Sequence, residues 1–449
     1  MTITSTSKSH SSQPGSVPSD SAQHANSYYA SSVNEVTDYP CLEGELRVDV
    51  VIVGGGFTGV ASAVELSERG LKVAIVEANK IGWGATGRNG GQVTGSLSGE
   101  TQMLKHLRSQ MGRDDADDFL WNLRWRGHDI IKDRVEKYGI DCDLKFGHLH
   151  TAYKPSHMKE LQINFDEANR RGMGDQVELV SAADIPQYLE TELYHGGLLN
   201  RRNMHLHSLN LCIGEAKAAE SMGAKIFENS KVVDIIHGDT PVVITDKGRI
   251  TANAVLLAGN AYHRLEQKKM KGLIFPACGG NVVTEPLGDE IAAKINPQDL
   301  AVYDCRFVLD YYRLTADKRL MLGGGANYSG RESRDIAAEM RPAMESIFPR
   351  LKGVGIEYAW SGMMGIVINR IPQLGKLSDN VYYAQGYSGH GVALTHIVAE
   401  IMGQAISGSM EKFDLFAAVK HTRLPLGDWA GSQMMAMGMW YYLLLERFR

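Results

Sequence analysis

The clearest pattern of hydrophobic and polar positions along the chain lies around residue 50. The segment RVDVVIV (47–53) is a short apolar run rich in β-branched residues, which predicts a buried strand of a parallel sheet. In the next segment, VASAVELSERG (60–70), apolar residues recur at helical spacing and a glycine closes the run, so we expect a helix. A second apolar run, KVAIV (72–76), predicts another strand. Together the three segments predict a β-α-β unit.

Two further patterns predict elements in the second half of the chain. The segment LTHIVAEIMGQAI (394–406) carries an apolar stripe at helical spacing, which predicts a helix. Two apolar segments, 309–314 and 320–323, are expected to pair as strands around a turn at 316–318.

The two ends of the chain look different. Residues 1–26 are rich in serine and lack apolar periodicity, so we expect a disordered tail. The segment MMAMGMWYYLLL (434–445) is apolar but too short to span a membrane. We therefore expect no transmembrane segment, and a C-terminal helix over 426–449 that docks on the rest of the protein. A membrane-surface anchor is the alternative for this helix.

Composition and charge narrow the class of protein. Hydrophobic residues make up 43% of the 449 residues and charged residues 22%, which is typical of a packed soluble protein. A net charge of -5 argues against nucleic-acid binding. The five cysteines are scattered and form no CxxC or Cys/His cluster, so we expect neither a disulfide framework nor a metal site. The reducing cytoplasm is the expected compartment.

A glycine motif, GGGFTG (54–59), directly follows the first predicted strand. Gly54 permits a tight turn, Gly56 lets the backbone approach a pyrophosphate at the helix N-terminus, and Gly59 allows close packing of helix and strand. Glu77, at the end of the second strand, is placed to accept hydrogen bonds from a ribose. This context predicts a dinucleotide-binding site.

A second glycine-rich segment, ANKIGWGATGRNGGQ (78–92), follows Glu77. So many small residues suggest a loop that lies flat along a large planar ligand, with Arg88 and Asn89 as donors to it. An NAD enzyme needs no such loop, whereas an enzyme with a buried flavin does. A flexible surface loop is the alternative interpretation.

At this point the sequence resembles the FAD-dependent amine and amino-acid oxidases of the D-amino-acid-oxidase, sarcosine-oxidase and glycine-oxidase type. The resemblance rests on DVVIVGGGFTG (49–59), on GATGRNGG (84–91) and on GYSGHGV (386–392). Narrower motifs resemble the oxidases of gamma-glutamylated polyamines within that family. These are SYYASS (27–32) and DYYRLTADKRL (310–320); the likeness also includes NAYH (260–263) and YYAQGYSGHGV (382–392).

The resemblance implies a set of positions that contact FAD. They are Gly54, Gly56, Phe57, Thr58, Gly59, Glu77 and Ala78; Gly84, Ala85, Thr86, Arg88, Asn89, Gly90, Gly91 and Gln92; Val232; Ala258, Gly259 and Asn260; and Gly389, His390, Gly391 and Val392. The last four precede the predicted helix 394–406, whose positive N-terminal end would stabilise the reduced flavin ring. Some relatives attach FAD through a cysteine near 360–372. This segment contains no cysteine, so we expect non-covalent FAD.

The resemblance also implies an α/β fold of the D-amino-acid-oxidase and glutathione-reductase type. A Rossmann-type FAD-binding domain (27–140, 204–275 and 356–425) would be interleaved with a substrate domain (141–203 and 276–355) built on a mostly antiparallel sheet.

Tyr312, Arg313 and His390 are the candidates for the substrate pocket. Because neighbouring residues on a strand point to opposite faces, only one of Tyr312 and Arg313 is expected to face the flavin. Arg313 either binds a substrate carboxylate or belongs to a structural ion pair. Catalytic residues cannot be assigned from these patterns. Three other histidines are expected to be packing or surface groups more often than substrate contacts: His205, His207 and His396.

The reaction that the resemblance implies is the oxidative deamination of a primary amine. Its α C–H would pass a hydride to flavin N5, the imine would hydrolyse to an aldehyde and ammonia, and O2 would reoxidise the flavin to give hydrogen peroxide. The expected partners are a gamma-glutamylated polyamine and O2; the oligomeric state stays open. The alternatives are a secondary-amine or amino-acid oxidase acting on pipecolate or sarcosine, a quinone-linked amine dehydrogenase, and an FAD-bearing subunit without turnover.

Overall fold

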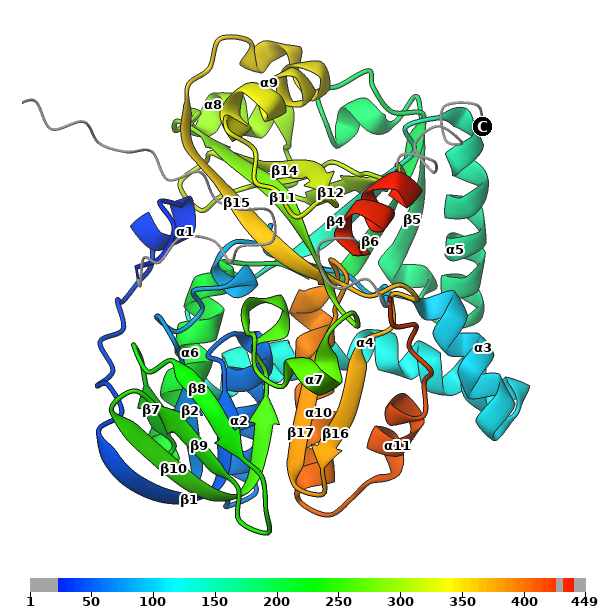
Figure 1. Cartoon of the computed structure of the whole chain (residues 1–449). Coiled ribbons are helices and arrows are strands. Elements are labelled where there is room, and N and C mark those ends of the chain that lie inside the picture. The colour runs from blue at the N-terminus through cyan, green and yellow to red at the C-terminus, as the bar shows by residue number, and fades with distance from the viewer. Residues whose placement is uncertain (1–22, 425–430, 440–449) are drawn as a thin grey trace, which may run out of the picture.

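The computed structural model describes residues 23–424 and 431–439, which form two β-sheets with helices packed around them (Figure 1). We call the eight-stranded sheet in the lower half of the view sheet A, and the nine-stranded sheet above it sheet B. The predicted tail at 1–26 lies mostly outside the described residues. Of the predicted C-terminal helix at 426–449, residues 431–439 are described and are helical.

Sheet A is mainly parallel and contains the predicted β-α-β unit. Its central path runs β16-β17-β10-β1-β2-β7, in which only β16 pairs antiparallel, and the β8–β9 hairpin joins β10 from outside this path. Its strands are β1 (Gly44–Val53), β2 (Val73–Val76), β7 (Lys225–Phe227), β8 (Val232–Ile236), β9 (Val242–Thr245), β10 (Gly248–Leu257), β16 (Gln373–Ser378) and β17 (Val381–Gln385). The strands predicted at 47–53 and 72–76 are thereby confirmed as β1 and β2.

Helices α2 (Phe57–Glu68), α6 (Ser208–Ser221) and α10 (Gly391–Ile406) pack side by side over sheet A, and the long helix α4 (Arg113–Tyr138) crosses α10 and α6. α2 and α10 confirm the helices predicted at 60–70 and 394–406. Both begin a few residues earlier than predicted, because the glycines that precede each apolar stripe already form the first turn.

Sheet B has the order β15-β11-β14-β13-β12-β4-β6-β3, with β5 paired to β6. All its pairings are antiparallel except that of β12 with β4, as expected for the mostly antiparallel sheet. The hairpin predicted at 309–323 is β13–β14. The strands are β3 (Gln92–Val93), β4 (Lys145–Thr151), β5 (Val177–Ser181), β6 (Gly196–His205), β11 (Phe275–Thr284), β12 (Ala301–Asp304), β13 (Tyr311–Leu314), β14 (Leu320–Asn327) and β15 (Ile356–Ile366).

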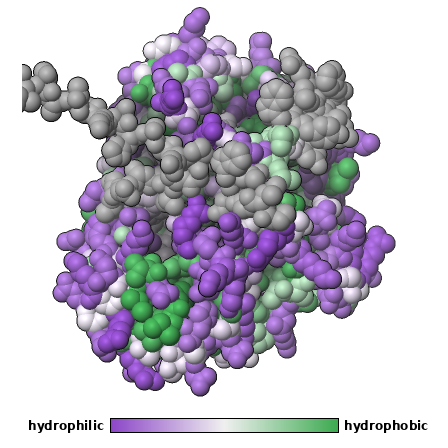
Figure 2. Space-filling view, viewed as in Figure 1, coloured by the Kyte–Doolittle hydropathy of each residue, from purple (hydrophilic) through white to green (hydrophobic). Residues whose placement is uncertain are grey.

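The other helices lie around both sheets (Figure 1). They are α1 (Tyr28–Ser31), α3 (Glu100–Met111), α5 (Met158–Arg170), α7 (Gln267–Met270), α8 (Gly288–Ile295), α9 (Ile336–Ile347) and α11 (Glu411–Ala417). In the described part of the chain, no helix combines the length and the apolar character needed to cross a membrane. Figure 2 shows a mostly polar face with one apolar area over the β8–β9 hairpin, where Val233 and Ile236 are exposed.

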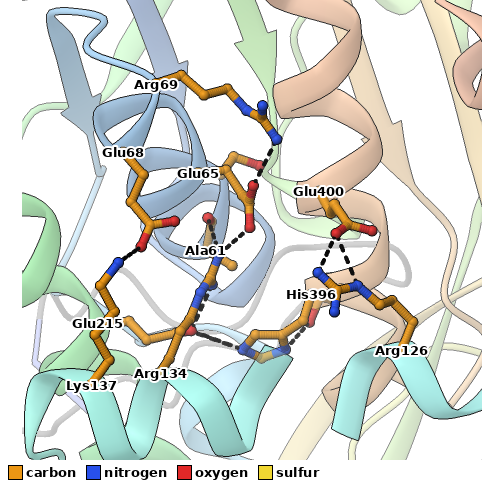
Figure 3. A network of polar contacts seen from close by, with 12 residues as sticks. Ala61, Glu65, Glu68, Arg69, Arg126, Arg134, Lys137, Glu215, His396 and Glu400 are labelled. Carbon is orange, nitrogen blue, oxygen red and sulfur yellow. Dashed lines mark hydrogen bonds and ion pairs between the residues drawn. The ribbon is translucent and has the colours of Figure 1, made fainter. Parts of the chain in front are cut away.

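A buried network of charged side chains joins the four helices behind sheet A (Figure 3). Arg134 of α4 donates to Glu65 of α2 at 2.7 Å and to Glu215 of α6 at 2.8 Å. His396 of α10 contacts Glu215 through Nε2 at 3.1 Å and the Val392 carbonyl through Nδ1 at 2.6 Å. Because both ring nitrogens of His396 face acceptors, the ring donates from both and carries a positive charge.

Glu215 is fully buried, and its ionisation depends on these neighbours. Burial alone would raise the pKa of Glu215, but the charges of His396 and Arg134 outweigh it and lower that pKa to about 2. The carboxylate therefore stays ionised in the interior and ties α6 to α4 and α10.

We expect Glu215→Gln to lower the free energy of unfolding by about 3 kcal/mol, because two buried cations lose their shared carboxylate. Chemical denaturation at neutral pH measures this change. The matched control is Glu290→Gln, which removes an exposed i,i+4 pair with Lys294 and should leave the free energy of unfolding nearly unchanged.

The pH dependence gives a second readout for the same variant. Since the folded pKa of Glu215 lies below its ordinary value of 4.5, its contribution is complete above that value and is lost as the pH falls toward 2. E215Q should therefore lose less stability than the wild type over that window. Equal destabilisation by the two substitutions would contradict the assigned role of the network.

Candidate active site

The GGGFTG turn connects β1 to α2 at the carboxyl edge of sheet A. Gly54 has φ +114°, and a Cβ there would lie 3.0 Å from the backbone of Ala258. A Cβ at Gly59 would overlap the carbonyl oxygen of Gly54, so only glycine lets α2 approach the strand this closely. Gly56 caps α2 without a side chain, and the first turn holds no acidic residue. The positive N-terminal end of α2 is therefore left for an anion.

Glu77 follows β2 and lies beside this turn. Its Oε2 accepts from the Gly55 amide at 2.6 Å and its Oε1 from the Asn79 amide at 2.8 Å. Burial raises the pKa of Glu77. A carboxylate has about four acceptor sites, so each oxygen can accept a further hydrogen bond from a ribose hydroxyl. Ala78, the next residue in the chain, is exposed to solvent.

The loop at 82–92 is ordered by its own side chains, so the alternative of a flexible surface loop is wrong. The Thr86 hydroxyl accepts from the Phe57 amide at 2.9 Å, which fastens the loop to the start of α2, ahead of Thr58. Asn89 accepts from the Gly91 amide and the Ser208 hydroxyl, each at 2.7 Å. Its Nδ2 donates to two loop carbonyls, of Ala85 and Thr86.

The expectation that the side chains of Arg88 and Asn89 donate to a ligand ring is not supported by these contacts. The polar side-chain atoms of Asn89 are used by the loop itself and by Ser208 of α6. Arg88 is buried, donates through Nε to the Trp83 carbonyl at 3.0 Å and lies 4.5 Å over the Trp83 ring. Both residues shape the loop, which leaves the backbone of Gly84 and its neighbours as the surface offered to a ligand.

The loop then runs under sheet B. A Cβ at Gly90 would overlap the Tyr311 ring, and a Cβ at Gly91, where φ is +72°, would overlap the Leu206 carbonyl. Gln92 donates from Nε2 to the carbonyls of Val302 at 3.1 Å and Tyr312 at 3.2 Å. One short segment thus links the N-terminus of α2 to the centre of sheet B.

The predicted positions 258–260 follow β10 at the carboxyl edge of sheet A. The Ala258 amide donates to the Val53 carbonyl at 2.8 Å, and Gly259 precedes the short turn that begins at Asn260. The Asn260 side chain accepts from the Gly386 amide at 2.9 Å and thereby joins the end of β10 to the segment before α10. Val232 is buried at the start of β8.

The predicted segment 389–392 forms the start of α10. Gly389 has φ +94°, His390 caps the helix without a side-chain hydrogen bond, and Gly391 and Val392 open its first turn, which contains no acidic residue. His390 is accessible to solvent, yet the atoms around it bury it enough to lower its pKa. It lies beside a second uncapped helix N-terminus.

Arg313 has neither of the two predicted roles. It is one of the largest fully buried side chains and makes four hydrogen bonds, none of them to a carboxylate. Nε donates to the Gly90 carbonyl at 2.9 Å and Nη2 to the Leu206 carbonyl at 2.9 Å. The Tyr29 hydroxyl and the Leu314 carbonyl accept the other two. The guanidinium therefore holds the glycine loop against sheet B.

Tyr312 points away from the loop, and Tyr311 takes its place. Tyr312 lies in the core beneath α9, 5.3 Å from the Phe348 ring, and donates to the Tyr194 hydroxyl. Tyr311 is partly exposed, covers Gly90 and donates to Asn281 at 3.0 Å. Strand alternation was predicted, but sequence alone does not say which face is the loop side. The Tyr311 ring lies so close to Gly90 that a Cβ there would overlap it, and this contact shows that Tyr311 faces the loop.

The remaining histidines have structural contacts, as expected. His205 contacts the Asp299 carbonyl at 2.9 Å. His207 accepts from the Asn210 amide at 3.1 Å and caps α6. His396 belongs to the buried network.

Sequence reasoning missed Glu228, which ties the N-terminal segment to the glycine loop. Its carboxylate is fully buried. It accepts from the Thr37 hydroxyl, from the Tyr39 amide at 3.2 Å, from Lys80 Nζ at 2.9 Å and from the Ile81 amide at 2.8 Å. A single acidic residue after a short strand carries no motif, so only the tertiary contacts reveal it.

These features fit FAD. The uncapped N-terminus of α2 and the glycine cradle at Gly54 and Gly56 suit a pyrophosphate, and Glu77 suits a ribose. The loop at 84–92 and the uncapped N-terminus of α10 suit the flavin and its pyrimidine edge. In the described residues, no group of three or more His, Cys, Asp or Glu side chains is arranged to hold a metal ion.

Comparison with known proteins agrees with this geometry. Residues 49–405 match the family model described as DAO, FAD dependent oxidoreductase. Gamma-glutamylputrescine oxidoreductase of Escherichia coli K12 is 39% identical over 428 residues, which cover 95% of this chain and 99% of that protein. A probable oxidoreductase OrdL of Haemophilus influenzae is 36% identical over 95% of this chain and 98% of its own length.

Solved structures show the same fold at lower identity. Glycine oxidase from Geobacillus kaustophilus superposes with a TM-score of 0.68 at 21% identity, covering 84% of this chain and 100% of that one. L-proline dehydrogenase from P. horikoshii superposes with a TM-score of 0.67 at 23% identity, covering 82% of this chain and 94% of that one. The fold class expected from the sequence is thereby confirmed.

We expect Gly59→Ala to purify with much less flavin than the wild type, because the added Cβ must displace α2 from the turn that receives the pyrophosphate. The flavin absorbance per mole of protein measures this. The control is Gly438→Ala in the C-terminal helix, where a Cβ meets nothing within 4 Å. Full flavin content in G59A would contradict the assigned role of the turn.

Proposed function

The chain belongs to the DAO family of FAD-dependent oxidoreductases, and from that premise we propose that it oxidises the primary amine of a gamma-glutamylated polyamine of the gamma-glutamylputrescine type. The products are an aldehyde, ammonia and, with O2 as the acceptor, hydrogen peroxide. One observation carries the substrate: the similarity to the Escherichia coli gamma-glutamylputrescine oxidoreductase extends over nearly the full length of both chains.

We propose that FAD binds non-covalently through the two helix N-termini and the glycine loop. When bound, it supplies the acceptor for the hydride. Segment 360–372, where some relatives carry a cysteine that bonds the flavin, has none in this chain. All five cysteines are free, which supports a cytoplasmic location.

Two side chains beside the segments proposed to bind FAD, Tyr311 over Gly90 and His390 before α10, support a mechanism without a strong base. Burial raises the pKa of Tyr311 and lowers that of His390, so near neutral pH the phenol stays protonated and the imidazole stays neutral. Tyr311 can orient a substrate through its ring and hydroxyl, and its ring excludes water above Gly90. Hydride loss from a neutral amine needs position and a dry site more than proton abstraction at carbon.

A secondary-amine or amino-acid oxidase is the second candidate. The solved structures of glycine oxidase and L-proline dehydrogenase share the fold, and at 21% and 23% identity they show nothing beyond it. A quinone-linked dehydrogenase would bind the amine at the same site and pass the electrons to a quinone in place of O2.

Anaerobic mixing of the purified flavoprotein with single amines tests the proposal. We expect gamma-glutamylputrescine to bleach the flavin absorbance rapidly, and putrescine, pipecolate and sarcosine to bleach it slowly or not at all. Admission of air should restore the colour and release one hydrogen peroxide per amine. Bleaching by pipecolate or sarcosine alone would move the protein to the second candidate, and bleaching without peroxide would favour the quinone acceptor.

The rate should rise with pH. A substrate ammonium group titrates near ~10.4, and only its neutral form can lose hydride, so kcat/KM should increase about tenfold per pH unit from pH 7 to 9. Neither Tyr311 nor His390 is expected to change charge over this range. Stopped-flow reduction at several pH values measures it, and a flat profile would contradict the neutral-amine mechanism.

A further inference from the structure

Arg370 lies in a strained turn after β15. Its φ is +63°, in the left-handed region that residues other than glycine rarely adopt. The Ser98 hydroxyl donates to the Arg370 carbonyl, and the Arg370 amide donates to the Val367 carbonyl at 3.0 Å. A Cβ at Gly99 would lie 2.6 Å from the Ile371 amide nitrogen, so the neighbouring loop packs tightly on the turn. The surroundings hold the arginine in this conformation.

The Arg370 guanidinium has almost no partner of its own. It donates to the Tyr328 hydroxyl at 3.3 Å and lies 5.8 Å from the centre of that ring. No carboxylate in the described part of the chain pairs with it, and the residue is partly exposed. A guanidinium carries five N–H donors in a planar fork, so most remain free for an anion.

The turn packs against the segment that leads into α10. The Val367 amide donates to Ser388 at 3.2 Å, and the Ser388 amide donates to the Gly365 carbonyl at 3.0 Å. Ser388, which binds this turn, lies two residues before His390, so Arg370 and His390 stand on neighbouring segments. Arg313, the arginine expected from the sequence to meet a substrate carboxylate, is buried with its donors turned to the protein backbone and a tyrosine.

We propose that Arg370 binds the α-carboxylate of the glutamyl group and so selects glutamylated amines over free ones. This assignment rests on the proposed function and names the residue that recognises its substrate class. A carboxylate would use the free edge of the guanidinium, and the amine end would extend toward the flavin. In this proposal the left-handed backbone at φ +63° directs the Arg370 guanidinium toward the carboxylate.

Two substrates isolate this contact: gamma-glutamylputrescine and 4-aminobutanoylputrescine, which lacks only the carboxylate. The key variant is Arg370→Gly, because glycine removes the guanidinium and tolerates the left-handed backbone. We expect R370G to lose about 10- to 100-fold in kcat/KM for the glutamyl substrate, mostly through KM, which is the range for one charge-assisted hydrogen-bonded pair. Its kcat/KM for the analogue should change less than about twofold, and its Tm should be unchanged or higher.

Two controls accompany R370G. Arg370→Lys keeps the charge but loses the fork and should fall between wild type and R370G. Arg47→Gly removes an exposed arginine in the first half of β1, away from the carboxyl edge of sheet A. It should leave kcat/KM for both substrates unchanged. An equal loss for both substrates, or a lowered Tm in R370G, would assign a structural role and overturn the proposal.

A binding readout separates this proposal from the proposed function. L-glutamate titrated into the oxidised flavoprotein should perturb the flavin spectrum of the wild type and not that of R370G. If no glutamylated amine is oxidised but this difference holds, the proposed function fails and the carboxylate site stands. Equal L-glutamate affinity in both proteins would overturn the site whatever the enzyme oxidises.

Discussion

The approach of α2 to the β1 turn, where Gly59 meets the carbonyl of Gly54, sets the position of the rest of the site. That contact fixes the N-terminus of α2, and the Thr86 hydroxyl fastens the glycine loop to the same helix end. At its other end α2 reaches the buried network through Glu65, which Arg134 joins to Glu215 and His396. The two uncapped helix N-termini, of α2 and α10, are therefore held by one scaffold of buried charges.

Such a scaffold suits a site that must bind a long, charged cofactor. Uncapped helix ends and a loop of glycines gain no stability from the groups they expose, so their geometry has to be imposed by the surroundings. Arg313 does this from sheet B by donating to the Gly90 and Leu206 carbonyls. Glu228 also helps to impose the loop geometry, because it binds Lys80 and Ile81 and joins them to the N-terminal segment.

The sequence predicted the parts of the fold that local patterns determine. The β-α-β unit, the helix at 394–406 and the hairpin around 316–318 follow from periodicity and turn residues. The separate roles of Tyr311, Tyr312 and Arg313 could not be predicted. Strand alternation places neighbouring side chains on opposite faces, but it does not say which face meets the loop. The buried network and Glu228 also escaped, since their partners lie dozens to hundreds of residues apart in the chain. Arg370 escaped because its distinguishing features are a backbone angle and a missing partner.

The measurement that tests this account most directly is the binding of FAD and of FMN to the apoprotein, followed by quenching of flavin fluorescence. FMN contains the flavin and one phosphate but lacks the pyrophosphate bridge and the adenosine ribose. If the α2 turn and Glu77 bind those groups, FAD should bind at least about 100-fold more tightly, since two or more charge-assisted hydrogen bonds are at stake. Equal affinity for FAD and FMN would contradict the assignment of the GGGFTG turn as the anchor of the site.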